Sequence, residues 1–169
     1  MRDDAQVLLP PSRWVATSLV LLMTAACGGG DGSGDACGPI TREALDSAYL
    51  VHVLGTATDV QYTSDPPTSG PHQAGPDVDG VVDEPITRPI QVGILEQGDV
   101  LLQHGPDLPA ADLADLKALG GPGVVVAPNP DLPAPVVATA WTYKRTCEAV
   151  DVAALQEFID ERVGKGAEG

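Results

Sequence analysis

Residues 65–72 constrain the fold more than any other segment, because they hold three prolines, a glycine and one of the three histidines of the chain. Each proline fixes its own φ at about −65°, removes a backbone donor and disfavours helical geometry in the residue before it. The segment therefore cannot form a helix or a central strand. No apolar side chain in it can anchor a core, so we expect a stiff irregular loop. We therefore expect the role of this loop to depend on its rigid shape and on the side chains of Thr68, Ser69 and His72.

The N-terminus has the composition of an export signal. Arg2 and Arg13 flank a mostly apolar run at residues 14–26, which is short of the roughly 20 residues that a membrane-spanning helix needs. Two small residues precede Cys27, as in the bacterial lipobox, in which the signal is cleaved and the new N-terminal cysteine is lipidated. Residues 1–26 are therefore predicted to be a lipoprotein-type signal peptide. The alternative is a plain secretory signal with Cys27 as an ordinary thiol.

The rest of the chain divides by composition into three parts. Residues 27–37 are rich in Gly, Ser and Asp and predict a flexible tether. Residues 38–164 are long enough for a single folded domain, and residues 165–169 form a short tail. We expect an exported protein of the cell envelope that faces the extracytoplasmic side. Its partners would be the membrane, through the lipid on Cys27, and an envelope protein.

Export places Cys37 and Cys147 in an oxidising compartment, where an even pair of cysteines favours a disulfide. A bridge between them closes a loop of more than a hundred residues. On the chain-entropy model such a loop contributes roughly 4–5 kcal/mol. The alternative is one reactive and one buried thiol. The chain has no CxxC motif, which disfavours a redox-active pair.

The chain is strongly acidic, with 24 Asp and Glu against 9 Lys and Arg and a formal charge of −15. Such a field repels nucleic acid phosphates and anionic lipid headgroups, so nucleic acid is excluded as a partner. Cationic ligands and metal ions remain compatible with it. Aromatic residues make up 4% of the chain, which disfavours a stacking platform for bases or sugars.

The pattern of apolar residues predicts an α+β fold, with a small mixed or antiparallel sheet covered by two helices. The two helices begin at Pro109 and at Asp151, and each carries an apolar stripe. A further short helix is expected at residues 41–47, and a long surface loop at residues 73–88. Strands are expected at residues 49–54, 58–62, 90–95, 99–104, 123–127 and 136–145, with a hairpin turn at residues 96–98.

The three histidines are the natural metal-ligand candidates. His52 is expected on a strand, His72 on the proline loop and His104 at a strand end, and the Glu96 carboxylate could complete a copper or zinc site. Their spacing matches none of the short motifs HxH, HxxxH or HExxH. The alternative is that each histidine is a surface or hydrogen-bonded structural imidazole.

Ser69 and His72 also invite comparison with a nucleophile and its base. Ser69, however, lies between prolines and lacks the GxSxG turn between a strand and a helix that exposes a catalytic serine. Thr68 and Ser69 are expected instead to bond their own backbone in a turn. No catalytic residue is assigned, and a binding role is favoured over an enzymatic one.

Three groups of residues together resemble a bacterial family known as DUF3105, whose members are often tethered to a membrane and whose function is not established. The ordered pieces cover about residues 49–145, and the central string is the most specific of them. They are His52-Val53 with Gln61-Tyr62, then Pro66-Pro67-Thr68-Ser69-Gly70-Pro71-His72, and then Leu95-Glu96-Gln97-Gly98-Asp99-Val100.

This chain departs from the family pattern at two positions. The later family motif typically reads Val-His-x-Leu-Glu-His-Gly, and its two histidines are replaced here by Gly93 and Gln97. The resemblance implies a metal or catalytic cluster in the family, and the departure predicts the loss of two of its ligands in this chain. His104 could compensate only if the fold turns it inward.

Two hypotheses follow. The first is an exported, lipid-anchored binding or interaction module whose functional face is formed by the proline loop and the region of Glu96. The second is an envelope metal-binding protein that uses His52, His72, His104 and Glu96 to hold copper or zinc. The second gains if two histidine nitrogens and the Glu96 carboxylate meet at a common point.

Overall fold

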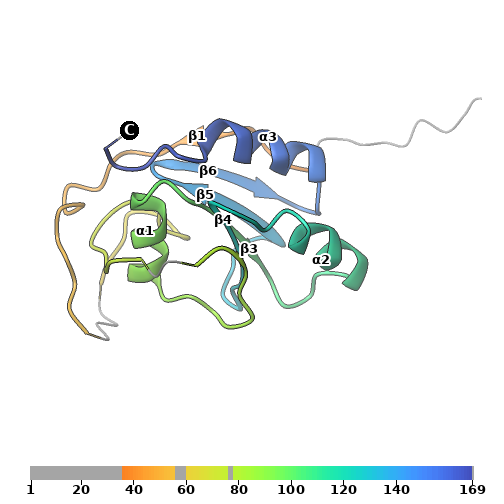
Figure 1. Ribbon diagram of the computed structural model, residues 1–169, viewed down its shortest axis with the longest axis horizontal. Helices are drawn as coiled ribbons and strands as arrows, with labels where there is room; N and C mark the ends of the chain where they lie inside the picture. The colour runs from red at the N-terminus through yellow and green to blue at the C-terminus, as the bar shows by residue number, and fades with distance from the viewer. Residues whose placement is uncertain (1–35, 56–59, 76–77, 169) are drawn as a thin grey trace, which may run out of the picture. The chain divides into compact units, whose positions relative to one another are not determined.

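The computed structural model describes residues 36–55, 60–75 and 78–168, which form one compact unit (Figure 1). The predicted signal peptide at residues 1–26, the predicted lipidation site at Cys27 and most of the predicted tether lie outside the described residues. Within the described part, no helix combines the length and the apolar character needed to cross a membrane.

A six-stranded mixed sheet forms the centre of the domain, in the order β1-β6-β5-β3-β4-β2. The strands on the β1 side of β3 pair antiparallel, whereas β3, β4 and β2 pair parallel. This confirms the predicted α+β class. The strands are β1 Thr41–Arg42, β2 Gly80–Val81, β3 Val100–His104, β4 Val124–Pro128, β5 Val136–Ala140 and β6 Tyr143–Cys147.

Helices cover both faces of the sheet. Successive side chains of a strand point to opposite faces, so β3 and β4 each contribute to two apolar clusters. Val100 and Leu102 of β3 pack with the buried residues of α2 (Ala110–Lys117) and α3 (Val152–Arg162). Leu101, between them, packs in a second cluster with α1 (Arg88–Glu96). The two expected helices are therefore α2 and α3, and α1 is an additional helix on the other face.

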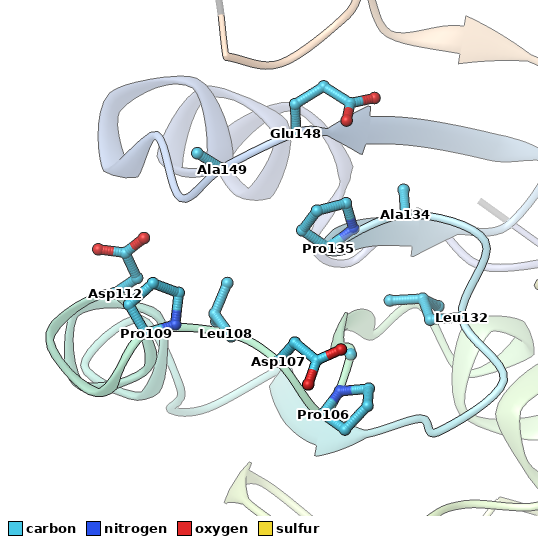
Figure 2. Close-up of a pocket in the computed structure, with 11 residues that line it drawn as sticks. Pro106, Asp107, Leu108, Pro109, Asp112, Leu132, Ala134, Pro135, Glu148 and Ala149 are labelled. Carbon is cyan, nitrogen blue, oxygen red and sulfur yellow. The ribbon is translucent and has the colours of Figure 1, made fainter.

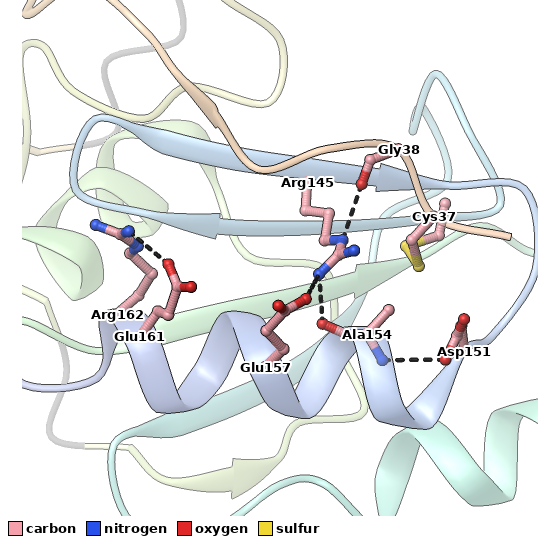
Figure 3. Close-up of polar contacts among 9 residues, drawn as sticks. Cys37, Gly38, Arg145, Asp151, Ala154, Glu157, Glu161 and Arg162 are labelled. Atoms are coloured by element: carbon pink, nitrogen blue, oxygen red, sulfur yellow. Dashed lines mark hydrogen bonds and ion pairs between the residues drawn. A yellow bond between two sulfur atoms is a disulfide. The ribbon is translucent and has the colours of Figure 1, made fainter. Parts of the chain in front are cut away.

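The elements with the clearest signals occur where the sequence predicts them. Pro109 stands at the N-cap position of α2, and the Asp151 side chain caps α3 by accepting a 3.0 Å hydrogen bond from the backbone N–H of Ala154 (Figure 3). The sequence predicted an apolar stripe of Val152, Leu155, Ile159 and Val163 on this helix. The buried residues are instead Leu155, Phe158 and Ile159, whereas Val152 and Val163 are 43% and 37% exposed.

The predicted strand at residues 90–95 is wrong, because this segment is the helix α1. Ile90, Val92 and Ile94 are β-branched and alternate with Gln91 and Gly93, which is the pattern of a strand. The local signal for a helix was Pro89 in the first turn, where a missing N–H costs nothing. The predicted hairpin turn at residues 96–98 is consequently the end of a helix.

The predicted long strand at residues 136–145 is also wrong, because it is the hairpin of β5 and β6. Its two-residue turn is Trp141-Thr142, and Thr142 adopts a φ of 60°. Such turns favour Gly, Asn or Asp, so a β-branched residue gave no signal for one. Two hydrogen bonds hold Thr142 there: its N–H donates to the Thr68 carbonyl (3.0 Å), and its carbonyl accepts from the Glu43 N–H (2.8 Å).

The expected elements before the proline loop are not formed as predicted. Instead of a helix at 41–47, Thr41 and Arg42 pair as β1 with the edge of β6. Residues 49–54 make no strand beyond a single bridge between His52 and His72. Of the strand expected at 58–62, the described residues 60–62 are irregular.

The predicted disulfide is present, with the sulfur atoms of Cys37 and Cys147 2.01 Å apart. Both cysteines are buried under α3, and the bridge fastens the start of the domain to the end of β6. Arg145 adds polar contacts there. Its Nε donates to the Gly38 carbonyl (2.9 Å), and its Nη1 contacts the Ala154 carbonyl and the Glu157 carboxylate (Figure 3).

Candidate metal centre

The proline loop is buried from Pro66 to Gly70, although it has no large apolar side chain. Its two hydroxyls do not close a local turn, as the sequence predicted, but bond residues more than twenty positions away. Thr68 Oγ1 donates to Glu43 Oε2 (2.7 Å), and Ser69 Oγ accepts from the Asp46 N–H (3.0 Å). These contacts hold the loop rigidly against the segment after β1.

Glu43 is the centre of this attachment. Its second carboxylate oxygen lies 2.9 Å from Lys144 Nζ on β6. Burial alone would raise the pKa of the Glu43 carboxyl, but hydrogen bonds from Ser64, Thr68 and Lys144 hold its pKa below the ordinary value of 4.5. The carboxylate therefore stays charged at neutral pH and binds the loop to the sheet.

Tyr62 holds the other end of the loop. Its hydroxyl donates to the Pro71 carbonyl (2.8 Å), and burial raises the pKa of Tyr62 to about 12. Gly70 adopts a φ of 128°, and a Cβ there would also lie 3.0 Å from the Tyr62 ring. The fixed loop places His72, two residues after Gly70, in the interior of the domain.

His72 is fully buried, and its two ring nitrogens have different environments. Nδ1 lies 3.1 Å from the Gly70 carbonyl oxygen, which can only accept, so Nδ1 carries the proton. Nε2 lies 2.8 Å from Glu96 Oε2, yet it is buried and makes no hydrogen bond. A backbone carbonyl on one ring nitrogen with the other left free is the usual orientation of a metal-binding imidazole.

His52 comes from the segment that pairs with His72. The Val53 N–H donates to the His72 carbonyl (2.7 Å), and the His72 N–H donates to the Val51 carbonyl (3.0 Å). This short parallel bridge sets the two imidazoles edge to face, with ring centroids 4.7 Å apart. His52 is exposed, so it brings the pair to the protein surface.

Glu96 is the last residue of α1, and its side chain is about one third exposed. The carbonyl end of a helix carries a partial negative charge, which disfavours a carboxylate and favours a cation. No basic residue stands in the last turn of α1 to compensate. The surroundings of Glu96 therefore attract a positive charge.

His52, His72 and Glu96 form the one group of described residues whose histidine, cysteine or carboxylate atoms are arranged to hold a metal ion. One potential ligand atom from each lies within 4.8 Å of the other two. A tetrahedral ion with bonds of about 2.1 Å separates its ligands by about 3.4 Å, so side-chain adjustments of about an ångström complete the site.

The contact between His72 and Glu96 favours a cation on electrostatic grounds as well. A neutral His72 that is protonated on Nδ1 presents a lone pair at Nε2, and Glu96 Oε2 faces it with another. Two acceptors 2.8 Å apart repel each other. The positive charge that this pair of atoms lacks can be a proton on Nε2 or a metal ion. A cation bound by both atoms removes the repulsion.

His104 does not belong to this group. It ends β3, and its Nδ1 lies 3.0 Å from the Gly105 carbonyl. Near this end of the sheet lies a cavity of about 380 Å³, whose lining includes three prolines, Leu108 and Leu132 (Figure 2). Its polar side chains are Asp107, Asp112 and Glu148, and none of the predicted site residues lines it.

Gly93 and Gln97, where the family motif has histidines, both contact the chain just after His72. A Cβ on Gly93 would overlap the backbone of Gln73 and Gly75, and Gln97 Nε2 donates to the Gly75 carbonyl (3.1 Å). These residues thus pack the loop exit against α1. The sequence predicted the loss of the two family histidines at these positions and a candidate metal set of His52, His72, His104 and Glu96, and the structure brings His52 and Glu96 beside His72.

Comparison with known proteins confirms the family that the sequence resembles. The sequence model of the DUF3105 family, described as a protein of unknown function, matches residues 52–168 and so covers all three clustered side chains. No curated protein and no solved structure matches the chain. Because the match extends over more than half of its length, the chain belongs to the DUF3105 family.

Proposed function

We propose that this protein binds a transition metal ion, zinc or copper, through His52, His72 and Glu96. The observation that carries the proposal is the buried Nε2 of His72, which faces the Glu96 carboxylate at 2.8 Å without a hydrogen bond while Nδ1 is fixed by a backbone carbonyl. Two imidazoles and one carboxylate suit zinc and copper, whereas magnesium and calcium prefer oxygen ligands alone.

Three protein ligands leave a coordination position open. His72 is buried, but His52 is exposed and Glu96 is partly exposed, so this position faces solvent. Structural zinc sites are usually closed by four protein ligands. The exposed side therefore favours a site that exchanges its ion or binds a further ligand on it, rather than one that only stabilises the fold.

The experiment is a competitive titration of the chelator-treated protein with zinc and with copper. We expect one ion per chain, and a loss of at least about 100-fold in affinity for His72→Ala, because neither remaining ligand fixes the ion from inside the protein. His104→Ala is the matched control, since it removes a histidine outside the cluster, and it should bind like the wild type. Equal affinities in all three proteins would refute the site.

A second candidate function is an interaction module, which one observation favours. Four large apolar side chains are exposed within residues 45–54, the segment that carries His52: Leu45, Leu50, Val51 and Leu54, at 47%, 72%, 51% and 91%. Exposed apolar clusters often mark contact sites for partners. If the titration finds no metal below millimolar concentrations, this function takes first place.

We also propose that the protein is exported and lipid-anchored through Cys27. The disulfide between Cys37 and Cys147 supports this, because such bonds persist in oxidising compartments. Mass spectrometry of membrane-extracted protein should find a mature chain that begins at an acylated Cys27. A soluble chain with a different N-terminus would contradict the anchor.

A further inference from the structure

A cavity of about 320 Å³ lies against the turn between β5 and β6 and the chain that follows α3. Three basic side chains line it. Arg42 lies on β1, Arg162 is the last residue of α3, and Lys165 lies in the C-terminal tail. The fold therefore brings together basic residues that are far apart in the sequence, and it does so in a chain of formal charge −15.

The charge pairing of these residues is unusual for so acidic a protein. Seven basic side chains lie in the described part of the chain, and five of them pair with a carboxylate. The other two are Arg42 and Lys165, which have no carboxylate partner among the described residues and line the same cavity. Since carboxylates greatly outnumber cations, chance would rarely leave these two together and unpaired.

Arg162 strengthens the positive character of the cavity. Its guanidinium lies 3.7 Å from the centroid of the Tyr143 ring, and that of Arg42 lies 5.9 Å from the same centroid. Glu161 binds Nη2 of Arg162 at 2.7 Å (Figure 3), but the Nε of Arg162 is buried and makes no hydrogen bond. A buried donor without an acceptor is costly, and an anionic oxygen is its strongest partner.

The same cavity has an apolar part. Leu45, which is 47% exposed, and Trp141 line it beside the three cations. We propose that this cavity binds an amphiphilic organic anion. The head, a carboxylate or a phosphate monoester, contacts Arg42, Arg162 and Lys165, and an aliphatic part packs against Leu45 and Trp141. This proposal does not depend on the metal site.

A strongly negative protein repels anions from its surface in general, so nonspecific binding of an anionic probe is disfavoured. The probes for calorimetric titration of the full chain are octyl phosphate, octanoate, inorganic phosphate and octanol. We expect saturable binding of octyl phosphate and octanoate, at least about 10-fold tighter than inorganic phosphate, which has no aliphatic chain to bury, and tighter than octanol, which has no charge.

The variant that tests the site is the double substitution Arg42→Gln with Lys165→Gln. Both side chains are exposed, so the fold should persist, which far-ultraviolet circular dichroism can check. We expect octyl phosphate to bind at least about 10-fold more weakly, since charge-assisted hydrogen bonds are the strong ones. Lys117→Gln, at an ion pair elsewhere on the surface, is the control and should bind like the wild type.

Vesicles distinguish the sources of such an anion. Co-sedimentation with phosphatidic acid vesicles, but not with phosphatidylcholine vesicles, that is lost in the double variant would identify a lipid headgroup. Binding of octyl phosphate without co-sedimentation would identify a soluble ligand, and both results support the site. The proposal is overturned if no amphiphilic anion binds at millimolar concentration, if octanol binds equally well, or if the double variant binds like the wild type.

Discussion

The two faces of the central sheet use the same strands but differ in chemistry. The face under α2 and α3 is closed by apolar residues and by the disulfide between Cys37 and Cys147. The face under α1 also has an apolar cluster, but it adds the buried polar residues His72, Gln91 and Gln103, with Gln103 placed there by strand alternation from Leu101.

The difference is clearest in the hydrogen bonds that are missing. Four buried side-chain atoms of the described residues have no hydrogen-bond partner. Three of them, on His72, Gln91 and Gln103, belong to the α1 face, and the fourth, Arg162 Nε, belongs to a residue that lines the basic cavity. Buried polar groups without partners are rare in folded proteins. We infer that the apolar core under α2 and α3 supplies stability, whereas the polar atoms left without partners lie on the α1 face and at the basic cavity.

The largest effect should come from the disulfide. Replacing both Cys37 and Cys147 by alanine should lower the free energy of unfolding by about 4–5 kcal/mol, because the bridge closes a loop across most of the domain. Urea unfolding measures this change. Zinc affinity of the folded protein should stay within about threefold. A loss of stability below about 1 kcal/mol would contradict the role given to this face.

Phe158→Ala tests the apolar face without touching the disulfide. Phe158 is fully buried in the cluster under α3, so its truncation should cost about 3–5 kcal/mol of unfolding free energy. Zinc affinity should not change, since the side chain belongs to the opposite face from His72. A parallel loss of metal binding would mean that the two faces are not separate in function.

Thr68→Val should have a smaller effect on stability but should also affect the site. It removes the hydrogen bond to the Glu43 carboxylate, which should cost about 1.5–3 kcal/mol at pH 7. It should also weaken zinc binding, because that bond fixes the loop carrying His72. Thr146→Val, at an exposed position of β6, is the control and should change stability by less than about 0.5 kcal/mol.

The same variant has a defined pH dependence. The pKa of Glu43 is lowered in the folded protein, so its stabilising contribution is complete above its ordinary value of 4.5 and is lost as pH falls through the lowered value. Urea unfolding of wild type and Thr68→Val should therefore differ at pH 7 and converge as the pH falls below the lowered pKa of Glu43. A difference that stays constant with pH would separate Thr68 from Glu43.

Sequence patterns predicted the α2–α3 face better than the α1 face, for a physical reason. Alternating or continuous apolar runs, a capping aspartate at Asp151 and an even cysteine pair identified β3, β4, α2, α3 and the disulfide. On the other face, the apolar residues of α1 alternate along the sequence as they would in a strand, and Thr142 occupies a turn that Gly or Asn normally marks. Both α1 and the turn at Thr142 are held by contacts to the proline loop or to the residue after it, which lie far away in the sequence.

The candidate site was predicted in its residues but not in its geometry. His52, His72 and Glu96 were all named from the chemistry of their side chains, and so was His104, which lies elsewhere. Their convergence depends on a single backbone bridge between residues 52 and 72 and on a helix that was taken for a strand. Neither has a signature in the local sequence.

The sharpest test of the metal site is the unfolding of Glu96→Gln with and without zinc. A glutamine removes the negative charge that faces the lone pair of His72 Nε2, so the metal-free variant should be more stable than the metal-free wild type by about 1 kcal/mol. With zinc at about 100 times its dissociation constant, the wild type should gain about 2.7 kcal/mol, and the variant should gain much less. The order of stability should therefore reverse on adding metal. A variant that is less stable than the wild type in chelator, with zinc stabilising both proteins equally, would contradict the account.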